Sequence, residues 1–317
     1  MLSAPPESVL ILKPSSLGDV VHTLPAVSAI RRHWPKTRLS WLVNPEWAPI
    51  LEGNPDLNDV HIFPRSQFRG LTGIPRMLSW ICSFQSRGQA DLVLDFQCLL
   101  RSALIGKWCR KKAFLGLSDA REGAKFFYDT VAEVTPEQHA VDRYLALVKA
   151  LGIPVPDSLT WNLPATPPPS GFDTSTYIVI HPFSRGLGKS MTADQLETLC
   201  KALSPNRVVI VGRSTEEVPN FSNVDNQLNK TTLSEMIAIM RQARWVISVD
   251  SGPMHIAAAL NPRVLSIHTW SDPQKVGPYD LSAWIWQNGQ LFQRGTPHKT
   301  VPADDMPTIA KWLLEQI

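Results

Sequence analysis

A short apolar run near the N-terminus passes directly into a polar, glycine-containing turn, and this junction most constrains what the chain can fold into. The run Val9-Leu10-Ile11-Leu12 is typical of a strand that is buried on both faces of a parallel sheet. A turn and an amphipathic segment follow it. Ligands of open α/β sheets bind at the carboxyl ends of the strands. We therefore expect a reactive site formed by the polar residues of this turn, which are Lys13, Ser15, Ser16, Asp19 and His22.

The size and composition predict a two-domain globular protein. The chain has 317 residues, of which 44% are apolar and 19% charged. Its apolar stretches are far shorter than the ~20 residues that span a bilayer, and the N-terminus lacks the features of a signal peptide. The four cysteines form no C-x-x-C pair, which disfavours a disulfide framework or a zinc site. We expect a cytoplasmic protein.

Positive charge is concentrated in one part of the chain. Residues 65–125 contain 11 Lys and Arg against 4 Asp and Glu, a local excess of +7, whereas the whole chain carries only +3. Such a bias points to an anionic partner, either a membrane surface, an anionic substrate or nucleic acid; the alternative is a solvated basic face. No nucleic-acid-binding module is present, so we expect no nucleic acid partner.

Short β-rich runs alternate with longer helical ones, which predicts βαβ units and parallel sheets. The Pro-rich stretch 156–175 predicts a linker between an N-terminal domain at 1–155 and a C-terminal domain at 176–300. Pro25 predicts a kink or a delayed start of the first helix. The expected strands are Val9–Leu12, Arg38–Val43, Val60–Phe63, Asp91–Phe96, Ala113–Leu115, Tyr177–Ile180, Val208–Val211, Trp245–Val249 and Val264–Ile267. The expected helices are Val20–Arg32, Ile74–Ser86, Leu99–Cys109, Pro136–Leu151, Ala193–Leu203, Leu233–Ala243, Pro253–Leu260 and Met306–Ile317.

A second strand-to-helix junction predicts an anion site. Asp250 and Ser251 follow an expected strand and can cap the next helix. Gly252 lets backbone N–H groups approach a ligand closely, and a helix N-terminus attracts negative charge such as a diphosphate. His255 lies in the first turn and adds a donor. The alternative is an ordinary capped helix with a core histidine.

Two further strand ends offer polar groups. The segment His181–Ser190 contains Gly188-Lys189-Ser190, but Phe183 stands where the P-loop requires glycine, so that motif is absent. A loop that presents Ser184 and Lys189 to a phosphate is still consistent with the sequence. Glu216 follows another strand end, where a carboxylate can accept hydrogen bonds from ribose hydroxyls.

Several motifs are missing. The chain has no G-x-G-x-x-G fingerprint, which disfavours a Rossmann oxidoreductase. It has no D-x-D pair, no H-E-x-x-H and no Cys/His cluster, so we expect no metal and no cofactor. It also has no G-x-S-x-G nucleophile elbow.

Taken together, these segments resemble the lipopolysaccharide heptosyltransferases, glycosyltransferase family 9. The stretch from Lys13 to Pro25 resembles the family's N-terminal signature. Four further segments resemble the family in the same order: Asp91–Gln97, which ends in D-x-Q with Cys98 in place of glycine; Arg121-Glu122 with Phe127-Tyr128 and then Gln138–Arg143; Asp250–His255, a D-[ST]-G-x-x-H motif; and Ser271–Pro273 with Gly277–Tyr279.

The resemblance implies the GT-B fold, in which two Rossmann-like α/β domains with parallel sheets face each other across a cleft. It implies inverting, metal-independent transfer of heptose from ADP-heptose to the Kdo–lipid A inner core of lipopolysaccharide. The anionic lipid-linked acceptor would lie on the N-terminal domain and the nucleotide-sugar on the C-terminal domain. The enzyme would be peripheral at the cytoplasmic face of the inner membrane. The last helix, in 301–317, would pack back on the N-terminal domain.

The resemblance also implies roles for single residues. Asp19 matches the general base, which takes the proton of a sugar hydroxyl as the glycosidic bond forms. Lys189 matches a catalytic, phosphate-binding lysine that stabilises the leaving ADP. The other donor positions are Ser184, Glu216, Asp250, Ser251, Gly252 and His255. The acceptor positions are Lys13, Ser15, Ser16, His22, Arg121, His139 and Arg143.

The donor loop departs from the family. The family commonly has R-x-x-K-x-W-P, whereas this chain reads Arg185-Gly186-Leu187-Gly188-Lys189-Ser190-Met191-Thr192, with one inserted residue and neither the tryptophan nor the proline. A family-9 enzyme with a different donor or acceptor is therefore one alternative. A non-catalytic nucleotide-sugar-binding protein is another, which the presence of Asp19 disfavours.

Overall fold

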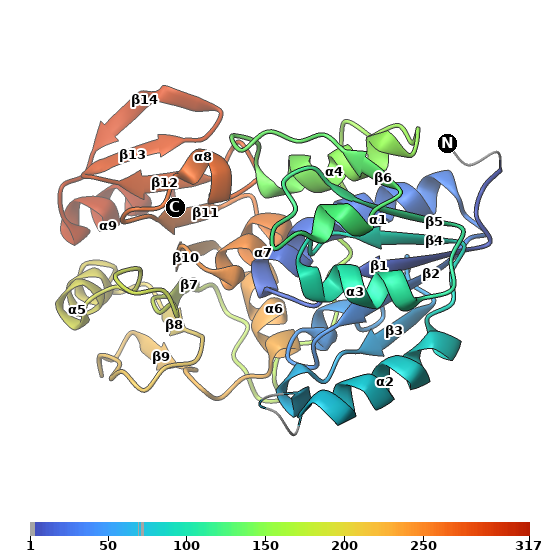
Figure 1. The fold of residues 1–317 in the computed structure, drawn as a ribbon. Coiled ribbons are helices and arrows are strands. Elements are labelled where there is room, and N and C mark those ends of the chain that lie inside the picture. Colours follow the sequence, from blue (N-terminus) through green and yellow to red (C-terminus); the bar gives the residue numbers. More distant parts are fainter. Residues whose placement is uncertain (1–3, 69, 71–72) are drawn as a thin grey trace. The chain divides into compact units, whose positions relative to one another are not determined.

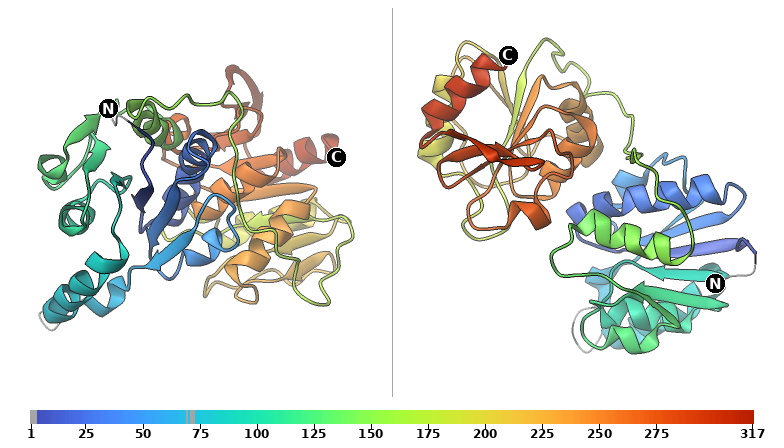
Figure 2. Two further views of the ribbon diagram at one scale, coloured as in Figure 1. Left: turned by 90° about the vertical axis from the view of Figure 1, so that its right-hand side faces the viewer. Right: turned by 90° about the horizontal axis from the view of Figure 1, so that it is seen from above.

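The structure, a computed structural model, describes residues 4–68, 70 and 73–317. It divides into two compact units, Met1–Pro164 and Ala165–Ile317. The boundary falls within the stretch expected as a linker. Each unit is a sheet with helices packed on its faces (Figures 1 and 2).

The first unit contains a parallel sheet whose strand order is β3-β2-β1-β4-β5-β6 in the described part of the chain. Its strands are β1 (Ser8–Leu12), β2 (Arg38–Val43), β3 (Asp59–Ile62), β4 (Leu92–Asp95), β5 (Ala113–Leu117) and β6 (Thr130–Ala132). Its helices are α1 (Leu17–His33), α2 (Gly73–Arg87), α3 (Leu100–Trp108) and α4 (Ala140–Ala150), with short 3₁₀ turns η1 (Ala48–Leu51), η2 (Arg65–Phe68) and η3 (Ala124–Phe127).

Burial on both faces explains why these strands are continuous apolar runs. Successive side chains of a strand point to opposite faces. Leu10 and Leu12 pack with Phe84 of α2 and Ile105 of α3. Val9 is fully buried on the other face, where α1 and α4 pack against each other (Figure 2). A parallel sheet covered in this way needs apolar residues at every position.

The second unit has the strand order β14-β13-β12-β11-β10-β7-β8-β9, parallel from β9 to β12 and antiparallel beyond. Its strands are β7 (Ile178–His181), β8 (Val208–Ile210), β9 (Val224–Asn226), β10 (Trp245–Val249), β11 (Val264–Ile267), β12 (Trp284–Gln287), β13 (Gln290–Gln293) and β14 (Thr296–Pro302). Its helices are α5 (Ala193–Ala202), α6 (Leu233–Gln242), α7 (Gly252–Leu260), α8 (Pro273–Val276) and α9 (Met306–Glu315). Among the described residues of both units, we find no helix that combines the length and the apolar character needed to cross a bilayer.

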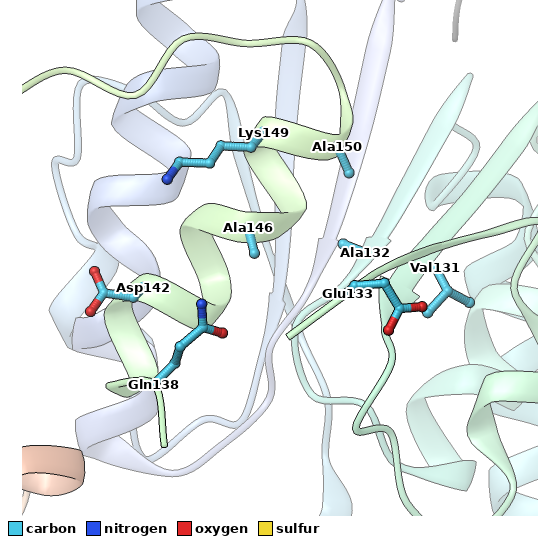
Figure 3. Close-up of a pocket in the computed structure, with 8 residues that line it drawn as sticks. All are labelled: Val131, Ala132, Glu133, Gln138, Asp142, Ala146, Lys149 and Ala150. Atoms are coloured by element: carbon cyan, nitrogen blue, oxygen red, sulfur yellow. The ribbon is translucent and has the colours of Figure 1, made fainter. Parts of the chain in front are cut away.

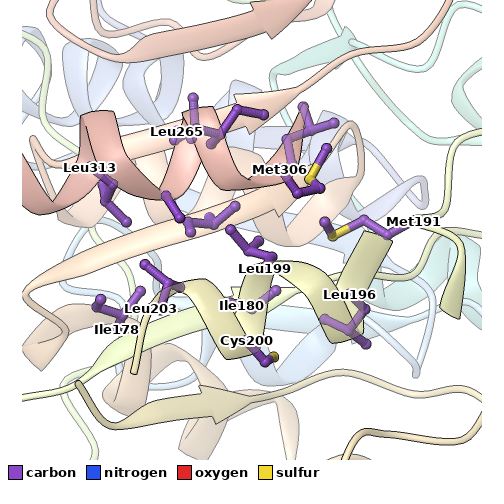
Figure 4. Close-up of a cluster of buried hydrophobic side chains, with 14 of the residues drawn as sticks. Ile178, Ile180, Met191, Leu196, Leu199, Cys200, Leu203, Leu265, Met306 and Leu313 are labelled. Carbon is purple, nitrogen blue, oxygen red and sulfur yellow. The ribbon is translucent and has the colours of Figure 1, made fainter. Parts of the chain in front are cut away.

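The last helix contributes its apolar face to the core of the second unit. Met306 and Leu313 of α9 share a buried cluster with Leu199 of α5 and Ile180 of β7 (Figure 4). Trp312 contacts the rings of Trp245 and Trp284. The apolar face of α9 is thus covered by strands and a helix of its own unit.

The first helix starts before the position that Pro25 suggested. It runs without a break from Leu17 to His33 and includes Pro25 in its interior. Proline removes one backbone hydrogen bond and strains the helix. Residues 20–30 are nevertheless all buried, so tertiary packing offsets the local cost of the proline.

Candidate functional site

The carboxyl ends of β1 and β4 form the first half-site. The strand order of the first unit reverses between these two neighbours, and a ligand crevice is expected where such a reversal occurs. Lys13 leaves β1, while Phe96 and Gln97 leave β4. The Lys13 ammonium donates to the Phe96 carbonyl at 2.9 Å, and the Ser15 amide donates to Gln97 Oε1 at 3.1 Å. The predicted residues after β1 therefore lie where the strand order reverses.

Asp19 is fixed by the start of its own helix. Ser16 caps α1, and Asp19 is the third helical residue. The carboxylate oxygen Oδ2 accepts from the Ser16 amide at 3.1 Å and from the Ser16 hydroxyl at 2.7 Å. This is the carboxylate half of a capping box, a local arrangement that four residues of sequence can encode. It orients the other oxygen, Oδ1, away from the helix end.

Tyr144 of α4 connects Asp19 to Lys13 and was not predicted as a site residue. Its hydroxyl donates to Asp19 Oδ1 at 2.8 Å and accepts from the Lys13 ammonium at 2.7 Å. The ammonium also lies 3.6 Å from Oδ1, and its side chain is only 3% exposed. No local pattern in the sequence marks Tyr144 as a site residue, because its two partners lie 131 and 125 positions away.

The charges around Asp19 keep it ionised. Burial by itself raises the pKa of its carboxyl group, but the Lys13 ammonium, the Ser16 hydroxyl and His22 together bring the pKa well below the usual value. Burial and the neighbouring carboxylate of Asp19 raise the pKa of Tyr144, so the phenol remains a neutral donor. The Asp19 side chain nevertheless keeps 37% of its surface exposed, so the carboxylate is accessible to a partner.

Two predicted acceptor positions have side chains that are engaged by other protein groups, and a third is held through its backbone. His139 is buried, caps α4 through its Nδ1 and lies edge-on to the ring of His22, with 5.1 Å between the ring centres. Arg143 pairs with Asp119. Arg121 is exposed and is tied to the crevice by its backbone amide, which donates to the Cys98 carbonyl at 3.0 Å.

A buried carboxyl group supports the end of β4. Asp95 accepts from the hydroxyls of Ser102 and Tyr128 at 2.8 and 2.9 Å and from the amides of Gln97 and Cys98. Burial raises the pKa of Asp95 to about 6, although each of these hydrogen bonds by itself lowers it. Cys98 has a φ of +56°, a backbone conformation that favours glycine. The positive φ explains why the resembling family motif has glycine at the position that Cys98 occupies in this chain.

The carboxyl ends of β7 and β10 form the second half-site. The strand order of the second unit reverses between them. Lys189, in the loop after β7, donates to Asp250 Oδ2 at 2.6 Å, and both side chains are largely buried. Burial raises the pKa of Asp250, but Lys189 and Ser271 outweigh this effect and the net shift is downward. A fixed ammonium group therefore lies at the start of α7.

Ser251 and Gly252 lie at the N-terminus of α7, where amide groups are available to an anion. The Ser251 hydroxyl donates to the Val249 carbonyl and lies 3.3 Å from His181 Nδ1. Burial lowers the pKa of His181 to about 4, so this ring is neutral at physiological pH. His255 is buried in the same helix. His181 is a further residue of this crevice that its place at a strand end could have indicated.

Ser184 and Glu216 lie on the loops that follow β7 and β8. The Ser184 amide donates to the Ser190 hydroxyl at 2.9 Å, which shapes the Lys189 loop. Glu216 is exposed, and its amide donates to the Ser214 hydroxyl at 3.1 Å. Both are thus on loops at the same edge of the sheet as Asp250.

Neither half-site brings together three or more His, Cys, Asp or Glu side chains that could hold a metal, and this holds for all described residues. An open hollow of about 620 Å³ lies elsewhere, between β6 and α4 (Figure 3). Glu133, Asp142 and Lys149 line it. None of the predicted site residues lines it, and it shares only the helix α4 with Tyr144 of the first half-site.

Known proteins resemble this chain over most of its length. Residues 85–302 match the model of glycosyltransferase family 9 (heptosyltransferase). Lipopolysaccharide heptosyltransferase 1 of Pseudomonas aeruginosa is 30% identical over 86% of this chain and 82% of its own length. The corresponding protein of Escherichia coli K12 is 28% identical over 87% of this chain and 92% of its own.

The solved structure of E. coli heptosyltransferase WaaC with ADP superposes with a TM-score of 0.77 at 23% identity, covering 98% of this chain and 99% of that one. At this level of identity the match establishes the fold, and it confirms the predicted GT-B class.

Proposed function

Since this chain belongs to glycosyltransferase family 9, we propose that it transfers heptose from ADP-heptose to the Kdo–lipid A inner core of lipopolysaccharide, with inversion and without a metal ion. The solved relative WaaC carries ADP in one structure and ADP-2-deoxy-2-fluoro heptose in another, which supports an ADP-sugar as donor. The further support comes from the chemistry of the two half-sites.

The observation that carries the proposal is the state of Asp19. A carboxylate offers about four lone-pair positions for hydrogen bonds. Ser16 occupies two on Oδ2, and the Tyr144 hydroxyl occupies one on Oδ1. The remaining position on Oδ1 suits the hydroxyl of an acceptor sugar. Because Lys13 keeps Asp19 ionised, the group is ready to accept a proton.

The proposed step is a single displacement. The acceptor hydroxyl gives its proton to Asp19 Oδ1 while its oxygen forms a bond to the anomeric carbon of the heptose. The bond from that carbon to the diphosphate breaks on the opposite face, and its electron pair leaves with ADP. The Lys189 ammonium and the amide groups at Ser251 and Gly252 stabilise the negative charge that develops on the diphosphate.

The remaining predicted residues hold the substrates. On the donor side, Glu216 accepts from the ribose hydroxyls, Ser184 shapes the phosphate loop, and His255 supports the start of α7. On the acceptor side, Arg121 and the basic excess of residues 65–125 attract the anionic saccharide and the inner membrane surface. His139 is buried and caps α4, and its ring contacts the edge of the His22 ring and so helps to hold His22 in place.

Donor identity is tested by thermal stabilisation. ADP-heptose at 100 times its dissociation constant is expected to stabilise the protein by about 2.7 kcal/mol, because it binds the folded state only. The measurement is a denaturation series with ADP-heptose, ADP-glucose and UDP-glucose. The altered loop 185–192 favours a second candidate, a family-9 enzyme with another donor, and stabilisation by a different nucleotide-sugar alone would support it. Binding without any transfer would indicate a non-catalytic nucleotide-sugar-binding protein.

Tyr144→Phe tests how Asp19 is kept ionised. The change removes one donor to the carboxylate, so the pKa of Asp19 rises and the acid limb of the kcat/KM profile moves to higher pH. Stability is expected to fall by about 1–3 kcal/mol, because the buried Lys13 ammonium loses an acceptor. The measurement is kcat/KM from the lowest pH at which the protein stays folded up to pH 9, together with the melting temperature.

The matched control is Tyr177→Phe, which removes another buried hydroxyl, bonded to the Ile239 carbonyl at 2.9 Å in the second unit. It is expected to lower stability without moving the acid limb. An acid limb at the same pH in Tyr144→Phe and in the unmodified protein would contradict the assignment.

A further inference from the structure

The segment after β11 fastens the loop that carries Lys189. The Thr269 hydroxyl donates to the Gly188 carbonyl at 2.9 Å, and the Trp270 indole N–H donates to the Leu187 carbonyl at 3.3 Å. Leu187 itself is 96% exposed and provides no apolar anchor. Two backbone carbonyls of this loop are therefore bound by side chains more than 80 positions away in the sequence.

The same segment surrounds the ammonium group of Lys189. The ammonium lies 4.8 Å from the centre of the Trp270 ring and 2.6 Å from Asp250 Oδ2. Ser271 hydrogen-bonds Asp250 from behind, and its hydroxyl lies 3.0 Å from Nδ1 of the buried His268. Four consecutive residues thus define where this cation stands.

The exposure of Trp270 requires an explanation. Trp270 is 68% exposed, although a tryptophan stabilises a protein most when its large apolar ring is buried. The exposed ring instead makes a favourable cation–π contact with Lys189, because the face of an indole attracts an ammonium group within about 6 Å. The sequence has no tryptophan in the Lys189 loop itself, so Trp270 supplies the aromatic surface from a different strand end.

We propose that Trp270 is a positioning residue that, with Thr269, holds the Lys189 loop in place and sets the Lys189 ammonium for the phosphates of the nucleotide donor. The assignment rests on the proposed function, since it names what orients the phosphate-binding lysine. Trp270 acts through Lys189, so its contribution depends on both the lysine and the phosphates. A surface that stacked on the adenine base would depend on neither.

The test is a double-mutant cycle on ligand binding. Trp270→Ala, Lys189→Gln and the double variant are titrated calorimetrically with ADP and with adenosine, which lacks phosphates. Trp270→Ala is expected to weaken ADP binding about fivefold, the size of an exposed cation–π contact. It should leave adenosine unchanged and add nothing in the Lys189→Gln background. Trp270→Phe keeps the ring and should retain most of the affinity.

Trp108→Ala is the matched control, because Trp108 is also an exposed tryptophan but lies at the end of α3 in the first unit. It is expected to bind ADP as the unmodified protein does. Equal weakening of ADP and adenosine by Trp270→Ala, or a full additional loss in the Lys189→Gln background, would overturn the proposal.

A second measurement separates this inference from the donor assignment. Trypsin cleaves after Arg185 and Lys189, so the cleavage rate reports how firmly the loop is held. Trp270→Ala and Thr269→Val are each expected to accelerate cleavage at these two bonds, and Trp108→Ala is not. If the unmodified protein bound no ADP, the donor assignment would fail. The proposal that Thr269 and Trp270 hold the loop would be rejected separately, by unchanged cleavage in both Trp270→Ala and Thr269→Val.

Discussion

Asp19→Asn is expected to lower kcat by about 10²- to 10⁴-fold, the contribution of a positioned general base. The amide has nearly the same shape as the carboxylate but cannot take a proton. It still accepts from the Tyr144 hydroxyl, so the local geometry at Oδ1 is kept. The measurement is the initial rate of heptose transfer at saturating substrates, together with ADP binding, which should not change because the donor half-site is built from the second unit.

The control must account for the structural role of Asp19 in capping α1. Glu235 occupies the same third position in the capping box of α6, where it accepts from the Thr232 amide at 2.7 Å and from the Thr232 hydroxyl at 2.8 Å. Glu235→Gln therefore removes a capping carboxylate away from either half-site and is expected to leave kcat unchanged. If Asp19→Asn and Glu235→Gln lowered kcat alike, capping would explain the effect. If Asp19→Asn kept full activity, another group would be the base.

Lys189→Gln is expected to lower kcat by about 10²- to 10³-fold and to weaken ADP binding, because one preorganised charge at a developing anion contributes about that much. The variant also leaves the largely buried Asp250 without its ion pair. Breaking such a pair costs about 3–5 kcal/mol of stability. The measurements are transfer rates, calorimetric titration with ADP, and the unfolding free energy, which shows whether the variant is folded under the assay conditions.

Lys201→Gln is a closely matched control. Lys201 also pairs with a carboxylate, Glu197, and its ammonium lies 5.2 Å from the ring centre of Phe221. It lies on the exposed surface of α5, away from the strand ends. The same change of charge there is expected to have little effect on either property, as for most exposed ion pairs. Equal losses in Lys201→Gln and Lys189→Gln would mean that net charge, rather than the placed ammonium, governs donor binding.

Much of the fold follows from local sequence patterns. The buried parallel strands β1, β2, β4, β10 and β11 were predicted nearly to their ends, because apolar runs of this length are encoded residue by residue. The strands β12 to β14, which pair with one another in antiparallel fashion, were missed. Asn288 and Gly289, both with positive φ, form the turn between β12 and β13, and an Asn-Gly pair is a strong hairpin signal. That signal is present in the sequence, but the strands on either side of it are of mixed polarity and do not form the apolar runs from which the other strands were predicted.

By itself, the sequence determined which residues stand at the strand ends, and with them the two half-sites. Asp19 follows β1 and is oriented by Ser16 three positions earlier, while Gly252 begins α7 directly after β10. These are short-range relations that backbone geometry translates directly into position.

Only the tertiary structure decided which distant side chains complete those half-sites. Tyr144 reaches Asp19 because α4 packs on α1. Trp270 reaches Lys189 because the segment after β11 is hydrogen-bonded to the loop that follows β7. The location of α9 in the core of the second unit was decided in the same way. Each of these contacts joins residues far apart in the chain, and their energy depends on how whole faces pack together, which no local pattern of residues records.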